Sequence, residues 1–428
     1  MTPSMKAIDP RKTPLAVLDI GSSKVACLLA APTVDGELQL RGYSYHAAQG
    51  IKSGNIVDID AACKVIRQAI QGTEHMAGMP IERLLVNLSA GQPSSYHVTA
   101  EIALGGRGVT DSDLQRALIE ARKSLPDNGQ ILAHALPIGY ALDNDHNIAD
   151  PRGLVGDTLS IITHLVAAST GPVRTLLSVL TDCHVEARAL VLGSYASGLS
   201  VLTADEMALG ATVIDMGGGM TSYSMFADSR FIFADRVAIG GSHVTSDLAR
   251  GLGTPVGHAE RLKCLYGQAM ASHLDERDLI SVPQLGDGEI VGSSRGDRGE
   301  DQQVPKAYLA RIIRPRLEET FELLAQKIAA APQANFINGN AADRFVLTGG
   351  GSQLPGVREL AQHILGRPVR YGSPRPLPGM EDFSNLPAFA TALGLIAFTR
   401  QPSFANVQDV NDGEGVGARV MNWIKRHV

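Results

Sequence analysis

Two short loops carry residue types that suit phosphate binding. Their glycines let backbone N–H groups approach an anion closely, and their serine, threonine and lysine side chains add further donors. The aspartate that opens each loop is a candidate for holding hydrated Mg²⁺ through water, because Mg²⁺ keeps several waters and needs few carboxylates. The loops are Asp19-Ile20-Gly21-Ser22-Ser23-Lys24 and Asp215-Met216-Gly217-Gly218-Gly219-Met220-Thr221.

Each loop lies between two apolar or β-prone runs, which predicts a strand, a tight polar turn and a second strand. The runs are 15–18 and 25–30 around the first loop, and 211–214 and 222–226 around the second. For Asp19 and Gly21 taken alone, an ordinary hairpin turn is the alternative. Two such hairpins can close on one phosphate chain from opposite sides. The sequence therefore predicts two related halves with a nucleotide between them.

A third glycine loop supports this interpretation. Gly349, Gly350 and Gly351 follow a short apolar run at 345–347 and precede a helical pattern, and Gln353 lies in the same loop. A glycine backbone can lie against a base or ribose, and a helix N-terminus can face an anion. Three glycine loops, each at the carboxyl end of a predicted strand, together favour nucleotide binding over three unrelated turns.

Composition narrows the class of protein. A chain of 428 residues predicts two or more domains. The net charge of −6 gives no general attraction to nucleic acid, so we expect no nucleic-acid partner. Four scattered cysteines without a CxxC pair predict buried thiols rather than a disulfide framework or a zinc site. No apolar run reaches ~18 residues, and residues 1–13 lack the apolar core of a signal peptide. We therefore expect a cytoplasmic protein unless an anchor attaches it to a surface.

Changes of pattern along the chain predict its domain organisation. Helical spacing at 60–76, 171–182, 194–202 and 307–328 alternates with β-prone runs. A compact stretch beginning with the strand 84–88, and containing a glycine turn at 105–108, predicts an inserted α+β subdomain. The predicted units are a disordered lead (1–13), a first domain in two parts (14–83 and 166–205), the inserted subdomain (84–165), a second domain that returns to the first near its end (206–400), a flexible linker (401–415) and a terminal helix (416–428).

The terminal helix has the pattern of a membrane-binding segment. At 100° per residue its apolar side chains share one arc and its basic side chains lie on the other, a pairing typical of interfacial helices. A helix docked on the protein body is the alternative. The linker before the helix has a reach of roughly 20 Å, and a docked helix rarely needs so loose a tether. Each basic residue contributes only about 1 kcal/mol at an anionic surface, so one helix binds reversibly and a row of helices binds more firmly. The candidate membrane residues are Val416, Arg419, Val420, Trp423, Ile424, Lys425 and Arg426.

Several segments in matching order resemble the FtsA family of bacterial cell-division proteins, within the actin/Hsp70/sugar-kinase superfamily. The resemblance implies an α/β, actin-like (ribonuclease H-like) two-domain ATPase fold with an inserted α+β subdomain and a C-terminal amphipathic helix. It implies ATP and Mg²⁺ as cofactors, with phosphates at the first two loops and adenosine at the third. The segments that carry it are 20–25, 106–110, 150–154, 253–255, 259–263 and 349–356.

The resemblance also assigns two residues and shows two departures. It implies that Glu260 and Lys263 contact ribose or adenine, whereas their spacing alone favours a surface ion pair worth a few tenths of a kcal/mol. Met220 stands where the superfamily commonly has threonine, and Thr221 comes one position late. Residues 193–202 contain no Gln or Glu that would orient an attacking water. We therefore expect ATP binding with at most slow hydrolysis, and assign no catalytic residue.

The function implied by the resemblance is that of a polymerising adaptor. Such a protein would lie on the cytoplasmic face of the inner membrane at the division site, tether the FtsZ ring there through residues 416–428, form filaments with itself and recruit later division proteins through residues 84–165. One alternative is a small-molecule kinase of the same fold, which needs a general base in its cleft. Another is a pilus-assembly relative, which we expect to lack the basic tail.

Overall fold

The computed structural model describes residues 13–125, 128–272, 274–283, 302–331, 343–381, 383 and 385–401. The predicted terminal helix at 416–428, and all but the first residue of the predicted linker, lie outside the described residues. Among the helices that are described, none is long and apolar enough to cross a membrane.

The first half of the chain is built on a five-stranded sheet with the order β11-β6-β1-β2-β3. β1 runs antiparallel to β2 and parallel to β6. The helices α1 (Ile59–Ala77) and α3 (Thr170–Asp182) share a core with one face of this sheet. A short hairpin of β4 (Ile51–Lys52) and β5 (Asn55–Ile56) precedes α1. The sheet strands are β1 (Leu15–Ile20), β2 (Lys24–Pro32), β3 (Leu38–Ala47), β6 (Arg83–Leu88) and β11 (Glu186–Leu192).

The predicted start of the inserted subdomain at residue 84 is wrong. β6 lies in the first sheet, where Leu84, Leu85 and Val86 are buried and pair in parallel with both β1 and β11. Its apolar residues are those of a strand covered on both faces, which is the usual place of a parallel strand. The separate sheet of the insert begins only at Ser94.

The second half repeats the arrangement of the first. Its sheet has the order β14-β13-β12-β17-β18, in which β12 is antiparallel to β13 and parallel to β17. Four helices share a core with it: α6 (Gly241–Leu252), α7 (Val256–Tyr266), α8 (Lys306–Ala330) and α9 (Val357–Leu365). β15 (Leu279–Val282) and β16 (Gln302–Pro305) form a separate ribbon. The sheet strands are β12 (Ala211–Met216), β13 (Thr221–Ala227), β14 (Arg230–Val237), β17 (Phe345–Thr348) and β18 (Val369–Tyr371).

Two helices lie between the sheets and join the halves. α4 (Gly193–Val201) and α10 (Ala390–Phe398) contribute to one apolar cluster that includes Val17 of the first sheet and Val213 of the second. The helices cross so closely that a Cβ added at Gly394 would lie 1.8 Å from the carbonyl oxygen of Ala196. This crossing sets how near the two sheets come to each other. α5 (Ala204–Leu209) follows α4 and leads into β12.

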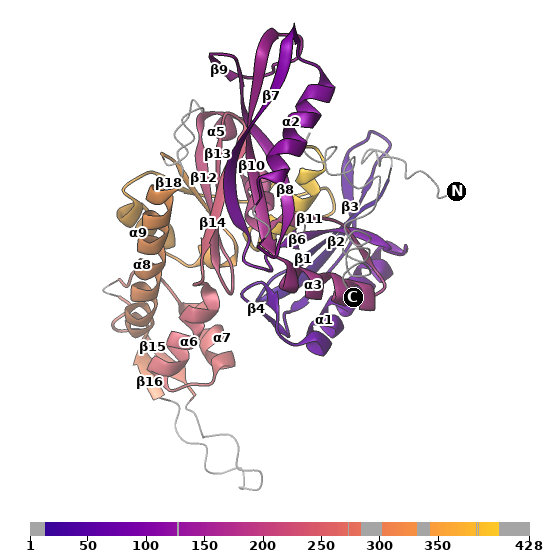
Figure 1. Cartoon of the computed structure of the whole chain (residues 1–428). Coiled ribbons are helices and arrows are strands. Elements are labelled where there is room, and N and C mark those ends of the chain that lie inside the picture. Colours follow the sequence, from indigo (N-terminus) through magenta and orange to yellow (C-terminus); the bar gives the residue numbers. More distant parts are fainter. Residues whose placement is uncertain are drawn as a thin grey trace.

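The inserted subdomain is a four-stranded sheet with one helix, and it projects from the top of the molecule in Figure 1. The predicted turn at 105–108 lies within β7, where Gly105 and Gly106 have positive φ beside an irregularity in the pairing with β10. The insert consists of β7 (Ser94–Gly108), α2 (Asp111–Lys123), β8 (Gln130–Leu142), β9 (Asp145–Ile148) and β10 (Val155–Ser169), with the strand order β7-β10-β8-β9.

The insert docks on the second half although the chain connects it to the first. Its side chains bind the backbone of β14, the edge strand of the second sheet. Ser95 Oγ donates to the carbonyl oxygen of Ala234 at 2.8 Å, and His97 Nε2 lies 2.6 Å from that of Ile232. His164 lies between the two elements, with Nδ1 3.2 Å from the Phe231 carbonyl oxygen and Nε2 2.9 Å from Ser95 Oγ. The docking thereby covers a sheet edge that would otherwise expose unpaired backbone groups.

The helix crossing gives a first prediction. Gly394→Ala forces a methyl group against the Ala196 backbone, so we expect it to lower the free energy of unfolding by about 1–3 kcal/mol. Denaturant unfolding followed by circular dichroism measures this change. Gly171→Ala is the matched control, because Gly171 is a helical glycine with open space around its Cβ position. Equal stability of the two variants would contradict the close crossing of α4 and α10 at Gly394.

The docked histidine gives a second prediction. Burial, helped by nearby His97, lowers the pKa of His164 to about 3 from its ordinary value of 6.5. The folded protein then binds fewer protons than the unfolded chain below pH 6.5, so stability is full above pH 6.5 and declines as the pH falls toward 3. We expect His164→Gln to reduce the loss of unfolding free energy between pH 7 and 4.5 by about 2 kcal/mol. Denaturant unfolding at the two pH values measures this difference, and an equal loss of stability in the two proteins would contradict it.

Candidate nucleotide-binding site

A cavity of about 850 Å³ lies between the two halves, and the three glycine loops line it. Every residue that the sequence predicted as a nucleotide contact is in its wall, so the structure brings all of them together, while their roles stay predictions. From the first half come Asp19, Gly21, Ser22, Ser23 and Lys24; from the second half come Asp215, Gly217, Gly218, Gly219, Met220, Thr221, Glu260, Lys263, Gly349, Gly350, Gly351 and Gln353.

The first two loops close with the same turn. The Gly21 N–H donates to the Lys24 carbonyl oxygen at 3.0 Å, and the Gly217 N–H donates to the Met220 carbonyl oxygen, also at 3.0 Å. Each loop joins two antiparallel strands whose pairing continues up to the turn. The prediction of two strand–turn–strand hairpins is therefore confirmed.

The two hairpins touch each other across the cavity. A Cβ at Gly218 would lie 2.9 Å from Ser23 Cβ, and a Cβ at Gly219 would lie 2.6 Å from Ser22 Oγ. The β4–β5 hairpin closes the same contact, because Ser53 Oγ donates to the Gly219 carbonyl oxygen at 3.3 Å. The glycines of the second loop are therefore required by the close approach of the two halves, as well as by the turn itself.

Helix α6 fixes the direction of the second loop. Its first N–H groups, from Gly241 and Ser242, donate to the carbonyl oxygens of Gly217 and Gly218 at 2.9 and 2.8 Å. Across a trans peptide the carbonyl and the next N–H point in opposite directions, so the N–H groups of Gly218 and Gly219 point away from α6. The Thr221 hydroxyl donates to the Ile239 carbonyl oxygen at 2.8 Å, and it is therefore already engaged within the protein.

The third loop lies against the end of β12 because β17, the strand before it, pairs in parallel with β12. Gly349 has a φ of +83°, and a Cβ there would lie 2.3 Å from Asp215 Oδ1. Gly351 is also close to the strand end, since its Cβ would lie 2.9 Å from the Met216 carbonyl oxygen. Only glycine fits at these two places, and the loop then continues into the short 3₁₀ helix η1 (Gly350–Gln353).

Three charged groups line the cavity: Asp19 is buried, and Asp215 and Lys24 are half-buried. Burial raises the pKa of Asp19 to about 7, an effect that Lys24 partly offsets. Burial also raises the pKa of Asp215, against the effect of hydrogen bonds from Ser197 and Thr391. The pKa of Lys24 is lowered to about 8, again by burial. Its Nζ lies 3.2 Å from the centroid of the Phe389 ring, and no described residue gives it a hydrogen-bond partner.

This set of groups fits a magnesium nucleotide. An ammonium group without a hydrogen-bond partner suits phosphate oxygens, and two carboxylates suit the waters around Mg²⁺. Phosphate and Mg²⁺ would also supply the opposite charges that buried ionised groups need.

Glu260 and Lys263 lie on α7 in the cavity wall, within a network rather than in an isolated surface pair. Lys263 Nζ donates to Glu260 Oε2 at 2.7 Å, to Thr245 Oγ1 at 2.9 Å and to the Gly241 carbonyl oxygen at 3.2 Å. Thr245 Oγ1 also donates to Glu260 Oε2. Burial would raise the pKa of Glu260, but the hydrogen bonds from Lys263 and Thr245 lower it overall. The network ties α7 to the first turn of α6.

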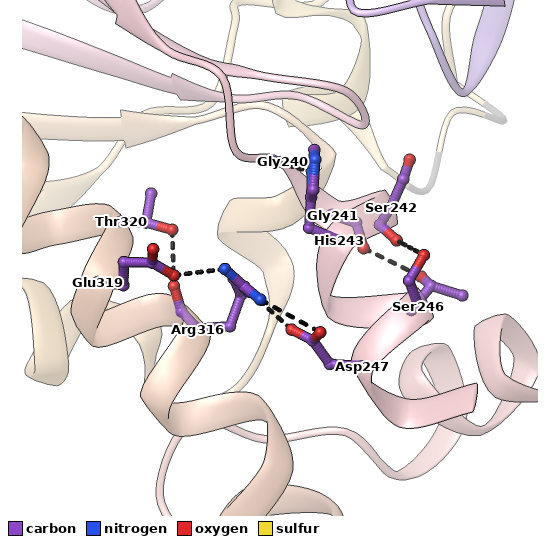
Figure 2. A network of polar contacts seen from close by, with 10 residues as sticks. Gly240, Gly241, Ser242, His243, Ser246, Asp247, Arg316, Glu319 and Thr320 are labelled. Atoms are coloured by element: carbon purple, nitrogen blue, oxygen red, sulfur yellow. Dashed lines mark hydrogen bonds and ion pairs between the residues drawn. The ribbon is translucent and has the colours of Figure 1, made fainter. Parts of the chain in front are cut away.

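Helix α8 holds α6 from another side, as Figure 2 shows. Arg316 of α8 donates from Nε to Asp247 Oδ2 at 2.6 Å and from Nη2 to Asp247 Oδ1 at 3.2 Å, and it also pairs with Glu319. At the start of α6, His243 Nδ1 accepts from the Gly240 N–H at 3.1 Å. Bidentate arginine–carboxylate pairs fix geometry as well as charge, so α6 presents its first N–H groups to the second loop in one fixed orientation.

Sequence reasoning missed several residues of the site. Asn87 binds the end of β1, accepting from the Ile20 N–H at 2.7 Å and donating to the Ile20 carbonyl oxygen at 3.3 Å. Thr391 Oγ1 donates to Asp215 Oδ2 at 3.3 Å. An asparagine inside the apolar run of β6 was a signal that could have been used. Gly240 and Gly241 were also missed, because their contacts with the second loop join residues that are distant in the sequence.

Comparison with known proteins identifies the family. A model of "Cell division protein FtsA" matches residues 212–394, and one of the "SHS2 domain inserted in FTSA" matches residues 90–167. The FtsA of Agrobacterium fabrum is 38% identical over 99% of this chain and 97% of its own length. That of Pseudomonas aeruginosa is 30% identical over 90% of this chain and 88% of its own. The chain belongs to the FtsA family of cell-division proteins. The match of the inserted domain begins after β6, in agreement with the sheet pairing.

Solved structures show that this FtsA-family chain has the actin-like fold. The PilM–PilN type IV pilus biogenesis complex contains a chain that matches with a TM-score of 0.63 at 17% identity, over 91% of this chain and 99% of that one. MreB5 of Spiroplasma citri bound to ADP matches with a TM-score of 0.53 at 13% identity, over 92% and 99%. The predicted actin-like α/β fold with an inserted subdomain is thereby confirmed.

The network on α7 gives a third prediction. Lys263→Met removes a cation from the cavity wall and leaves Glu260 without its charged partner, so we expect ATP affinity to fall at least about tenfold. Isothermal titration calorimetry with ATP and Mg²⁺ measures it. Arg261→Met is the matched control, because Arg261 is an exposed cation two residues away on the same helix. The assignment of Lys263 fails if both variants bind ATP equally well.

Proposed function

We propose that this FtsA-family protein holds ATP with Mg²⁺ between its two halves, polymerises on the cytoplasmic face of the inner membrane, and tethers the FtsZ ring there. The observation that supports nucleotide binding is the convergence of three glycine loops, from both halves of the chain, on one cavity. Two solved structures of the same fold, MreB5 of Spiroplasma citri, are bound to ADP and to AMPPNP.

The main candidate contacts have the following roles in this proposal. Lys24 and the N–H groups of the first two loops bind the phosphates, and Asp19 and Asp215 reach Mg²⁺ through its waters. The bound Mg²⁺ would neutralise phosphate charge. The loop at Gly349–Gly351, with Gln353, lies against adenosine, and Glu260 and Lys263 contact ribose or adenine.

The proposal is that ATP is held rather than turned over quickly. α4 contributes only Gly193 and Ser194 to the cavity wall, and its sequence contains no Gln or Glu that would orient an attacking water. The Thr221 hydroxyl, one position later than the superfamily pattern, is bound to Ile239. The nucleotide therefore serves mainly to hold the halves together, and a polymer of such units is the form that contacts the membrane.

Membrane attachment is assigned to residues 416–428, from their sequence pattern alone. Binding by one short helix is weak, so polymerisation and attachment reinforce each other through effective concentration. FtsZ is the partner that the protein tethers, and later division proteins are recruited through the inserted subdomain.

A small-molecule kinase is the second candidate, favoured by one observation. Asp19 is a buried carboxylate in the cavity with its pKa raised to about 7, which is a property of general bases. Family membership over nearly the full length weighs against it. Transfer of phosphate from ATP to a panel of sugars and small hydroxy acids would support the kinase and contradict the adaptor.

The tail gives a fourth prediction. Trp423→Ala removes the one aromatic anchor of the apolar arc, so we expect co-sedimentation with anionic liposomes to fall at least about fivefold. Asn422→Ala, on the opposite arc, is the matched control. Deletion of 416–428 should abolish co-sedimentation, and undiminished binding after deletion would rule out the tail as the anchor.

The tether itself is tested by adding purified FtsZ to anionic liposomes with ATP. We expect FtsZ to co-sediment when the full chain is present and to stay in solution with the chain lacking 416–428. Recruitment that does not depend on the tail would contradict tethering by this route.

A further inference from the structure

Two cysteines far apart in the chain meet at the packed surfaces of α1 and α3. Cys63 lies on α1 and Cys183 caps the end of α3, and their sulfur atoms are 3.4 Å apart. The expectation of four buried thiols is wrong in two places: Cys63 is partly exposed and Cys264 is exposed. The cysteine pair lies outside the nucleotide cavity and has no part in the proposed function.

The two thiols of the pair have different surroundings. The Arg67 guanidinium donates from Nη2 to Cys63 Sγ at 3.3 Å and to the Asp182 carbonyl oxygen at 3.1 Å, so one cation contacts both the thiol and the end of α3. A neighbouring cation stabilises the thiolate, which is the reactive form. Burial raises the pKa of Cys183 to about 12, with a further contribution from Cys63. Cys63 is thus the partly exposed thiol beside a cation, and Cys183 is the buried thiol within reach of it.

We propose that Cys63 and Cys183 form a reversible intramolecular disulfide when the protein encounters hydrogen peroxide. The Cys63 thiolate attacks one peroxide oxygen, the O–O bond breaks, and the departing hydroxide takes a proton to become water. Cys63 is now a sulfenic acid. The sulfur of Cys183 then attacks the sulfur of Cys63, the S–O bond breaks, and the hydroxide leaves as water with the Cys183 proton. Two thiols are oxidised to one disulfide, and one peroxide is reduced to two waters.

The geometry allows this bond with little movement. The sulfurs must approach from 3.4 Å to about 2.05 Å, which rotation of the two side chains can supply while α1 and α3 stay packed through Ile66 and Val179. The bond would join α1, which follows the β4–β5 hairpin at the cavity, to α3, which directly follows the last strand of the insert. It would therefore link the end of the inserted subdomain, where the chain leaves β10, to helix α1 of the first half.

The other two cysteines are less suited to react with peroxide or to form this disulfide. Cys27 is fully buried in β2. Cys264 lies on α7 in the other half, and burial and the charge of Glu260 both raise its pKa. A negative neighbour disfavours the thiolate, so Cys264 reacts slowly although it is exposed.

The test uses the full chain, reduced and then treated with hydrogen peroxide. We expect two thiols to become resistant to alkylation, a peptide linking Cys63 to Cys183 in mass spectrometry, and full reversal by dithiothreitol. Cys264→Ser should behave the same way. In Cys183→Ala, Cys63 should remain a sulfenic acid that dimedone labels. Free thiols at both positions after oxidation, or a disulfide through Cys264, would overturn the proposal.

The rate tests the part played by Arg67. We expect Arg67→Met to slow disulfide formation about three- to tenfold at neutral pH, because the guanidinium that contacts Cys63 Sγ is lost. Lys64→Met removes an exposed cation next to Cys63 and should leave the rate unchanged. Equal rates in the two variants would show that Arg67 does not activate Cys63.

Discussion

The contact between two glycine hairpins is the constraint on which the rest of the structure depends. Gly218 and Gly219 lie so close to Ser22 and Ser23 that no side chain fits between them. That distance is set elsewhere, by α4 and α10, which cross at Gly394 between the two sheets. The orientation of the second hairpin is set by α6, which α7 and α8 hold through ionic networks. The cavity is thus the product of contacts that lie mostly outside it.

The local parts of this arrangement could be predicted from the sequence, because each hairpin is a glycine turn between apolar runs. The strand β6 was assigned to the wrong unit for a definite reason: an apolar run shows that a strand is buried, and gives no information about the sheet it joins. The docking of the insert on β14 could not be predicted from the sequence either. His97 and His164 bind backbone carbonyl groups there, and backbone groups look the same in every sequence.

The candidate residues of the site could be predicted from their types, but the burial that shifts their pKa values could not. Asp19 and Lys24 were recognisable as candidates for Mg²⁺ and phosphate, but their buried state, and the resulting shifts of pKa toward neutral forms, depend on packing. Buried charges without a full set of partners destabilise the empty site. A bound magnesium nucleotide would supply those partners and favour the closed arrangement of the halves. This links the electrostatics of the cavity to the proposal that ATP holds the shape of a polymerising unit.

The central claim is that both hairpins bind the same phosphate chain. A crystal structure of the chain grown with Mg²⁺ and a non-hydrolysable ATP analogue tests it most directly. We expect electron density for the β- and γ-phosphates in the cavity that both loops line, in contact with Gly21–Lys24 and with Gly217–Gly219, and the adenosine against Gly349–Gly351. An empty cavity at saturating analogue, or a nucleotide bound to only one hairpin, would contradict it.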